Sequence, residues 1–123
     1  MLKRPLNPRF RAPVLRDVKT TTIRDKPWPV GVPIMLYNWS GAAYRSKQAD
    51  VAAVMVEESL ELVITRDMDD GGIVFCRDHI DGIPLHQTEG FDAAGQMQDW
   101  FRKVVKPGQT VTKHLMRFKL LPA

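Results

Sequence analysis

Cysteine is nearly absent from the sequence, since Cys76 is the only one. A single cysteine excludes an internal disulfide, which fits a reducing compartment such as the cytosol. Cys76 stands between Phe75 and Arg77 in a β-like stretch, and this setting predicts a buried structural thiol rather than a nucleophile. We therefore expect a cytoplasmic protein whose fold depends on packing alone.

Long hydrophobic runs and metal-binding patterns are also missing. No stretch approaches the roughly 20 apolar residues that a membrane helix needs, so we expect no membrane partner. The opening stretch MLKRPLNPRF is basic but lacks the apolar segment of a secretory signal. His79, His86 and His114 do not have the spacing of metal ligands, and no glycine-rich phosphate loop is present. We expect no metal and no cofactor.

What the chain does contain is typical of one globular domain. Its 123 residues are 44% hydrophobic and 26% charged, enough to close a core without disulfides or metals. Residues 1–8 carry Pro5 and Pro8 and show no periodicity. We interpret them as an N-terminal arm and residues 9–123 as a single domain.

The charges are unevenly distributed along the chain. Residues 1–26 hold eight Lys/Arg and two Asp, residues 27–99 hold four basic and twelve acidic side chains, and residues 100–123 hold six basic and none acidic. If the two ends meet in space, they form a basic face of the kind that binds nucleic acid. Two solvated surfaces would explain the same pattern equally well.

Hydrophobic periodicity predicts an α+β fold. We expect a short helix ending near Asp17, then strands at residues 19–25, 32–39, 72–78 and 110–121, and a helix capped by Asp92. Residues 50–66 are either two strands or one long strand bent at a polar break. Five to six antiparallel strands in so short a chain favour a small β-barrel, flanked here by two helices.

The stretch KTTTIRD, residues 19–25, offers the only distinctive chemistry. A threonine hydroxyl such as that of Thr22 becomes a nucleophile only when a base takes its proton. Lys19 can be that base if burial or a neighbouring cation, here Arg24, lowers its pKa. Glu89 is the conspicuous carboxylate outside the strands and could act as acid. A stabilising charge at the start of a helix is the alternative interpretation of Glu89.

Strand geometry constrains how these residues can meet. Side chains alternate along a strand, so Thr20, Thr22 and Arg24 share one face. Lys19 can reach Thr22 only if Lys19 lies before the regular strand, in the turn that leaves the short helix. A plain structural strand, in which Arg24 binds a carboxylate, is the alternative hypothesis.

The motifs of this sequence resemble those of the ASCH domain family. FRAPVLRDVKTTTIRD resembles the family's opening signature of a short helix, a Lys-Thr pair and Thr-(aliphatic)-Arg, here Lys19-Thr20 and Thr22-Ile23-Arg24. TEGF, at residues 88–91, and the closing MRFKLL also fit, in the family's order. The resemblance covers roughly residues 9–121.

The resemblance implies a PUA-like barrel and an association with RNA. It is strongest to small stand-alone bacterial members, and so implies an amidohydrolase that acts on an acylated nucleoside such as N(4)-acetylcytidine. The family's catalytic lysine, threonine and glutamate then correspond to Lys19, Thr22 and Glu89. Arg24 corresponds to the arginine that lines the same cleft.

A non-catalytic RNA-binding module that uses the same basic cleft is the second hypothesis. Trp28 could then stack on a base, although packing between Pro27 and Pro29 is its alternative role. The partner is a modified nucleoside under the first hypothesis and RNA under the second. The residues expected to contact either partner are Thr20, Arg24, Trp28, Arg117 and Lys119.

Overall fold

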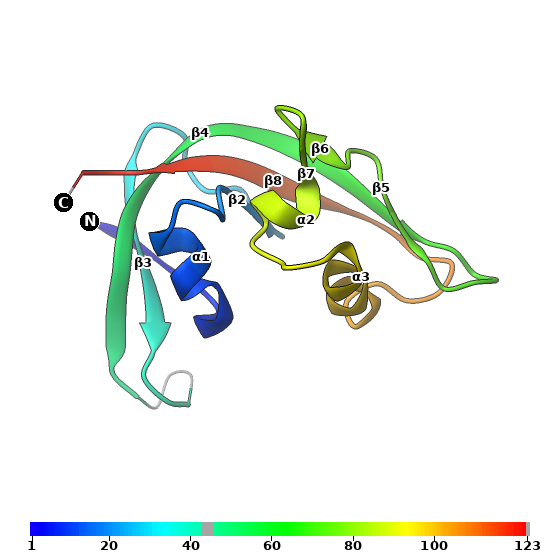
Figure 1. The fold of residues 1–123 in the computed structure, drawn as a ribbon, viewed down its shortest axis with the longest axis horizontal. Helices are drawn as coiled ribbons and strands as arrows, with labels where there is room; N and C mark the ends of the chain where they lie inside the picture. Colours follow the sequence, from blue (N-terminus) through cyan, green and yellow to red (C-terminus); the bar gives the residue numbers. More distant parts are fainter. Residues whose placement is uncertain (43–45, 123) are drawn as a thin grey trace.

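A long antiparallel ribbon of two strands forms the centre of the fold. In the computed structural model, which describes residues 1–42 and 46–122, β4 (Gln48–Arg66) pairs with β8 (Thr110–Leu120) from Val54↔Leu120 to Thr65↔Thr110. The ribbon arches over the helices of the protein (Figure 1). The expectation of a mixed α+β fold, mostly sheet with a few helices, is confirmed.

The remaining strands extend this ribbon into a sheet with the order β1-β3-β4-β8-β2, and a further strand, β5, also pairs with β4. Among the strands of the described residues, β1 and β3 form the only parallel pair. Within the described residues no pairing joins β1 to β2, so no closed barrel is found. The bounds are β1 Leu2–Pro5, β2 Thr21–Arg24, β3 Pro33–Trp39 and β5 Ile73–Phe75.

β4 is one strand of 19 residues, which settles the two alternatives for residues 50–66 in favour of a single strand. Its pairing with β8 shifts register between Val56 and Glu58, at the polar break in the sequence. A bulge at this point adds a residue on one side and bends the strand. The bend lets a single strand pair with β3 in its first half and with β5 near its end.

The N-terminal residues are part of the sheet, although the sequence predicted an arm there. β1 pairs with β3 and is followed by the 3-10 helix η1 (Pro8–Phe10), which Asn7 caps by accepting a hydrogen bond from Arg9 N. Pro5 and Pro8 argued against a strand in the sequence, but Pro5 is tolerated because β1 lies at a sheet edge.

The part of the chain that the structure describes contains three α-helices: α1 (Arg11–Leu15), α2 (Leu85–Thr88) and α3 (Ala94–Arg102). The prediction that Asp92 caps α3 is wrong, because the N-cap is Ala93. The backbone N–H of Asp92 instead donates to Gln96 Oε1, at 3.0 Å. Within the described residues no helix has the length and apolar character required to cross a membrane.

A small hairpin that the sequence did not predict precedes α2. β6 (His79–Ile80) and β7 (Ile83–Pro84) are joined by Asp81 and Gly82, which have φ values of 50° and 78°. Two successive positive φ values are the requirement of a tight type I′ turn, which Asp-Gly satisfies well. Arg117 of β8 donates to Asp81 Oδ2 at 2.7 Å and holds the hairpin against the sheet.

The core lies between the sheet and the helices. Its fully buried members include Val14, Ile34, Leu36, Val54, Val56, Leu62, Ile64, Leu115 and Met116. Phe10 and Phe91 pack edge-to-face, with ring centroids 5.2 Å apart. The prediction of a buried Cys76 is wrong: the residue is exposed in a bend after β5, and its Sγ accepts a hydrogen bond from Val63 N at 3.3 Å.

Candidate functional site

A cavity of about 150 Å³ lies between β2 and the segment that follows β1. The four residues singled out in the sequence, Lys19, Thr22, Arg24 and Glu89, all line it. The other lining residues are Leu6, Asn7, Phe10, Ile23, Phe91, Trp100 and Phe101. Polar groups capable of proton transfer therefore face a pocket whose other walls are partly aromatic.

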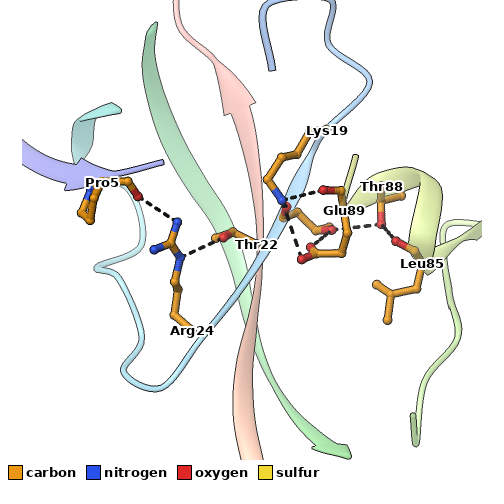
Figure 2. A network of polar contacts seen from close by, with 8 residues as sticks. Pro5, Lys19, Thr22, Arg24, Leu85, Thr88 and Glu89 are labelled. Carbon is orange, nitrogen blue, oxygen red and sulfur yellow. Dashed lines mark hydrogen bonds and ion pairs between the residues drawn. The ribbon is translucent and has the colours of Figure 1, made fainter. Parts of the chain in front are cut away.

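Lys19 lies in the turn before β2, where the geometric argument required it. The chain reverses at Asp17, whose φ is 59°, and the backbone N–H of Lys19 donates to Pro13 O at 3.0 Å. The side chain is only 3% exposed. Its Nζ donates to Thr21 O at 2.7 Å and to Glu89 O at 2.8 Å, and lies 3.7 Å from Glu89 Oε1 (Figure 2).

Burial lowers the pKa of Lys19 below its ordinary value. The charge of Glu89 opposes this effect, and the positive charge of Arg24 adds to it. In its neutral form the Lys19 amine has two hydrogens, and the carbonyls of Thr21 and Glu89 can accept one each. The lone pair of the amine is then free to take a proton.

The Glu89 carboxylate is held by Thr21, with Thr88 beside it, and the sequence interpretation missed both threonines. Its Oε2 accepts a hydrogen bond from the Thr21 hydroxyl, which also lies 2.9 Å from Thr88 Oγ1. Thr88 in turn donates to Leu85 O at 3.1 Å (Figure 2). The side chain of Glu89 is 6% exposed, and the residue is the C-cap of α2 through its backbone N–H, so Glu89 is not a charge at the start of a helix.

Gly90 allows Glu89 and Lys19 to approach this closely. Its φ is 93°, a value that favours glycine. A Cβ at this position would come within 3.1 Å of both Lys19 Cβ and Phe10 Cδ1. The Glu-Gly-Phe element is therefore a backbone requirement of the site as well as a source of its carboxylate.

Thr22 and Arg24 form a second group in the same cavity. Arg24 Nε donates to Thr22 Oγ1 at 3.1 Å, and Arg24 Nη2 donates to Pro5 O at 2.9 Å, which links β2 to β1 (Figure 2). Burial lowers the pKa of Arg24. Within the described residues no hydrogen bond joins Thr22 to Lys19 or Glu89. The Thr22 hydroxyl therefore accepts from Arg24 and keeps its own proton available.

The remaining predicted contact residues lie outside the cavity. Thr20 takes part through its backbone, its N–H donating to Thr88 O at 2.8 Å. Trp28 is 5% exposed and packs in the core. Arg24 Cζ lies over the Trp28 ring, 4.9 Å from the ring centroid. Arg117 forms ion pairs with Glu58 and Asp81, and Lys119 is exposed on β8. The structure thus does not bring these four side chains to the candidate site.

The sequence does contain a signal for Thr21 and Thr88, but the alternation of side chains along a strand drew attention to Thr22 instead. Strand alternation places Thr21 on the face opposite Thr22, and its hydroxyl bonds a different group, the carboxylate of Glu89. Thr88 directly precedes Glu89 and turns its hydroxyl toward Thr21. Two threonines beside a lysine and a glutamate indicate a hydrogen-bonded support for the carboxylate.

Comparisons with protein-family models, with curated proteins and with solved structures find no match for this chain. The chemistry of the cavity is therefore the basis for assigning a function. In residues 1–42 and 46–122 no three side chains among His, Cys, Asp and Glu gather in a group that could hold a metal ion.

Proposed function

We propose that this protein is an amidohydrolase that removes an acyl group from a modified nucleoside such as N(4)-acetylcytidine. The observation that carries the proposal is the buried Lys19, whose lowered pKa suits a base, in one cavity with the Thr22 hydroxyl and the Glu89 carboxylate. The sheet, bridged between β1 and β2 by Arg24, corresponds in this proposal to the PUA-like barrel of the ASCH family.

The first half of the reaction forms an acyl-enzyme. Lys19 Nζ takes the proton of the Thr22 hydroxyl, directly or through one water, while Thr22 Oγ1 attacks the acyl carbon. The bond from Arg24 Nε to Thr22 Oγ1 stabilises the developing alkoxide. When the C–N bond breaks, the amine leaves with the proton that Lys19 had taken.

The second half returns the enzyme to its starting state. Water attacks the ester on Thr22 and releases the carboxylic acid, while Lys19 accepts the proton of the water and returns it to Thr22 Oγ1. Glu89 Oε1, 3.7 Å from Nζ, stabilises the ammonium form of Lys19 in both halves. The sum is hydrolysis of one amide bond by one water molecule.

The walls of the cavity suit a flat, partly polar substrate. Phe10, Phe91 and Trp100 form an aromatic cluster in which Phe91 and Trp100 have ring centroids 5.7 Å apart. Aromatic faces stack on nucleobases, and such stacking tolerates different bases. Asn7 lines the same cavity and offers a side-chain amide to a base edge.

The test is to incubate the purified protein with N(4)-acetylcytidine and to follow cytidine by chromatography. Thr22→Ala and Glu89→Gln are expected to lower kcat by at least about 10³-fold without unfolding the protein. Thr20→Ala is the matched control, because the Thr20 hydroxyl forms no hydrogen bond among the described residues. A folded wild type without turnover, or a Thr22→Ala variant with full turnover, would reject the proposal.

RNA binding is the second candidate, and the surface around Trp100 favours it. Trp100 also lines two neighbouring hollows, which Arg9 and Lys103 border on one side and Lys113 on the other. Cations around a half-buried aromatic ring such as that of Trp100 suit a single-stranded nucleic acid. Titration of a labelled single-stranded RNA at rising salt tests this, because contacts to phosphates must weaken as salt rises.

A further inference from the structure

β2 lies at the edge of the sheet beside the cavity, and only β8 pairs with it among the described residues. In an antiparallel pair, alternate residues turn their backbone N–H and C=O toward the partner strand, and the residues between them turn these groups away. The side of β2 that faces away from β8 therefore carries backbone groups that no strand pairs with among the described residues. Which residues supply those groups depends on the phase of the ladder.

The phase follows from two hydrogen bonds. Phe118 N–H donates to Thr20 O at 2.9 Å, so Thr20 turns its carbonyl toward β8. The register places Thr22 opposite Met116, two residues further along, so Thr22 also faces β8. Thr21 and Ile23 must then face away. Lys19 Nζ confirms this phase by reaching Thr21 O from the open side, at 2.7 Å.

Ile23 consequently presents its backbone N–H at the open edge of β2. Ile23 also lines the cavity that holds Thr22. The Arg24 side chain is already in use as a donor, since it bonds Thr22 Oγ1 through Nε and Pro5 O through Nη2. Within the described residues the Ile23 N–H has no hydrogen-bond acceptor, so it remains available for a ligand.

We propose that the Ile23 N–H binds the acyl oxygen of the substrate and stabilises the oxyanion that forms when Thr22 attacks. The inference rests on the proposed function and adds a catalytic group to it. As the bond from Thr22 Oγ1 to the acyl carbon forms, the π electron pair of the C=O bond moves onto the oxygen. That pair re-forms the double bond when the amine leaves with a proton from Lys19.

The position of Ile23 in the chain suits this role. A backbone N–H directly after a nucleophile lies close to the carbon that the nucleophile attacks, and hydrolases use this arrangement. The strand fixes the direction of the N–H before substrate arrives, so no reorganisation is needed during the reaction. The Lys19, Thr22 and Glu89 side chains supply proton transfer but no neutral donor for an oxyanion.

Ile23→Pro tests the proposal because proline removes the N–H. No bond of the β2–β8 ladder is lost, since this N–H points away from β8, and edge strands accept proline in such positions. Thr22 already has the extended backbone that the residue before a proline requires. Ile23→Ala is the matched control, because it removes most of the side chain and keeps the N–H.

We expect Ile23→Pro to lower kcat by roughly 10²–10³-fold, the usual cost of losing one oxyanion donor, with KM changed only a few-fold. Ile23→Ala should lower kcat much less than Ile23→Pro does, because it keeps the N–H. Circular dichroism and thermal unfolding verify the fold of each variant. If Ile23→Pro does not fold, semisynthesis of the protein with an ester in place of the Thr22–Ile23 amide removes the same N–H.

Two failures are distinguishable. An active wild type with an undiminished Ile23→Pro or ester variant overturns the role of Ile23 alone, as does an Ile23→Ala variant that loses as much kcat as Ile23→Pro. The assay uses N(4)-acetylcytidine and, in parallel, p-nitrophenyl acetate, which needs the same attack on an acyl carbon. A folded wild type inert toward both overturns the amidohydrolase and the oxyanion donor together.

Discussion

Thr21→Val should destabilise the protein by about the net contribution of one buried hydrogen bond to the Glu89 carboxylate. Thr21 is fully buried, and its hydroxyl donates to Glu89 Oε2 and lies 2.9 Å from Thr88 Oγ1. Valine has nearly the shape of threonine, so the substitution opens no cavity. What it removes is a buried hydrogen bond to a carboxylate.

The expected loss is about 2 kcal/mol in the free energy of unfolding, since a hydrogen bond to a charged group contributes about 1.5–3 kcal/mol net. Unfolding entropy of about 2.1 cal/mol/K per residue gives about 0.26 kcal/mol/K for a chain of this length. The melting temperature should therefore fall by about 8 °C. Because Oε2 loses its donor, Glu89 should also be freer to turn away from Lys19.

Urea unfolding followed by circular dichroism measures the effect, with Thr20→Val as the matched control. Thr20 adjoins Thr21, but its hydroxyl has no hydrogen bond among the described residues, so its loss should stay below about 0.5 kcal/mol. The Thr21→Val and Glu89→Gln substitutions should also cost less together than the sum of each alone. Equal losses for the two valine variants, or strict additivity, would refute this account of the Thr21–Glu89 bond.

Three further substitutions test other parts of the structure. Arg24→Gln removes a cation that lowers the pKa of Lys19, so the pKa of Lys19 should rise. In a pH–rate profile, the rise of kcat/KM with pH should therefore move to higher pH. A shift to lower pH would contradict the assignment of Lys19 as base. Asn38→Ala removes the side-chain amide that donates to Leu6 O at 2.7 Å, and should lower the free energy of unfolding in urea by about 1–3 kcal/mol. An unchanged free energy of unfolding would show that the contact is dispensable. Asp81→Asn should speed amide hydrogen exchange in the β6–β7 hairpin and leave the urea midpoint unchanged, because its exposed ion pair with β8 holds only that hairpin; unchanged exchange would contradict this.

The sequence predicted best the elements whose periodicity is strong. The alternation in β3 and β8 and the apolar stripe of α3 follow from local patterns. β1 escaped prediction because its parallel partner lies about thirty residues away in the chain and its own sequence is basic and rich in proline. The β6–β7 hairpin had a usable signal, an Asp-Gly pair between two isoleucines.

The candidate site was predictable in its residue types but not in its contacts. Chemistry alone selected Lys19, Thr22, Arg24 and Glu89, and the structure places all four on one cavity. The bond from Thr21 to Glu89 could not be predicted, since it depends on how α2 packs against β2. The same is true of Trp28: its burial depends on the whole core, so the choice between stacking and packing needed the fold.

The pairing of β2 with β8 has a consequence for the order in which the protein is built. Lys113 of β8 contacts Asp25 at the end of β2, although 88 residues separate them in the sequence. At about 5–20 residues per second, a ribosome needs roughly 4–18 s to add that many residues. Throughout this interval β2 has no strand to pair with, and pairings this distant in sequence form slowly. Newly made chains should therefore acquire a folded β3–β4 hairpin before β2 gains its partner strand.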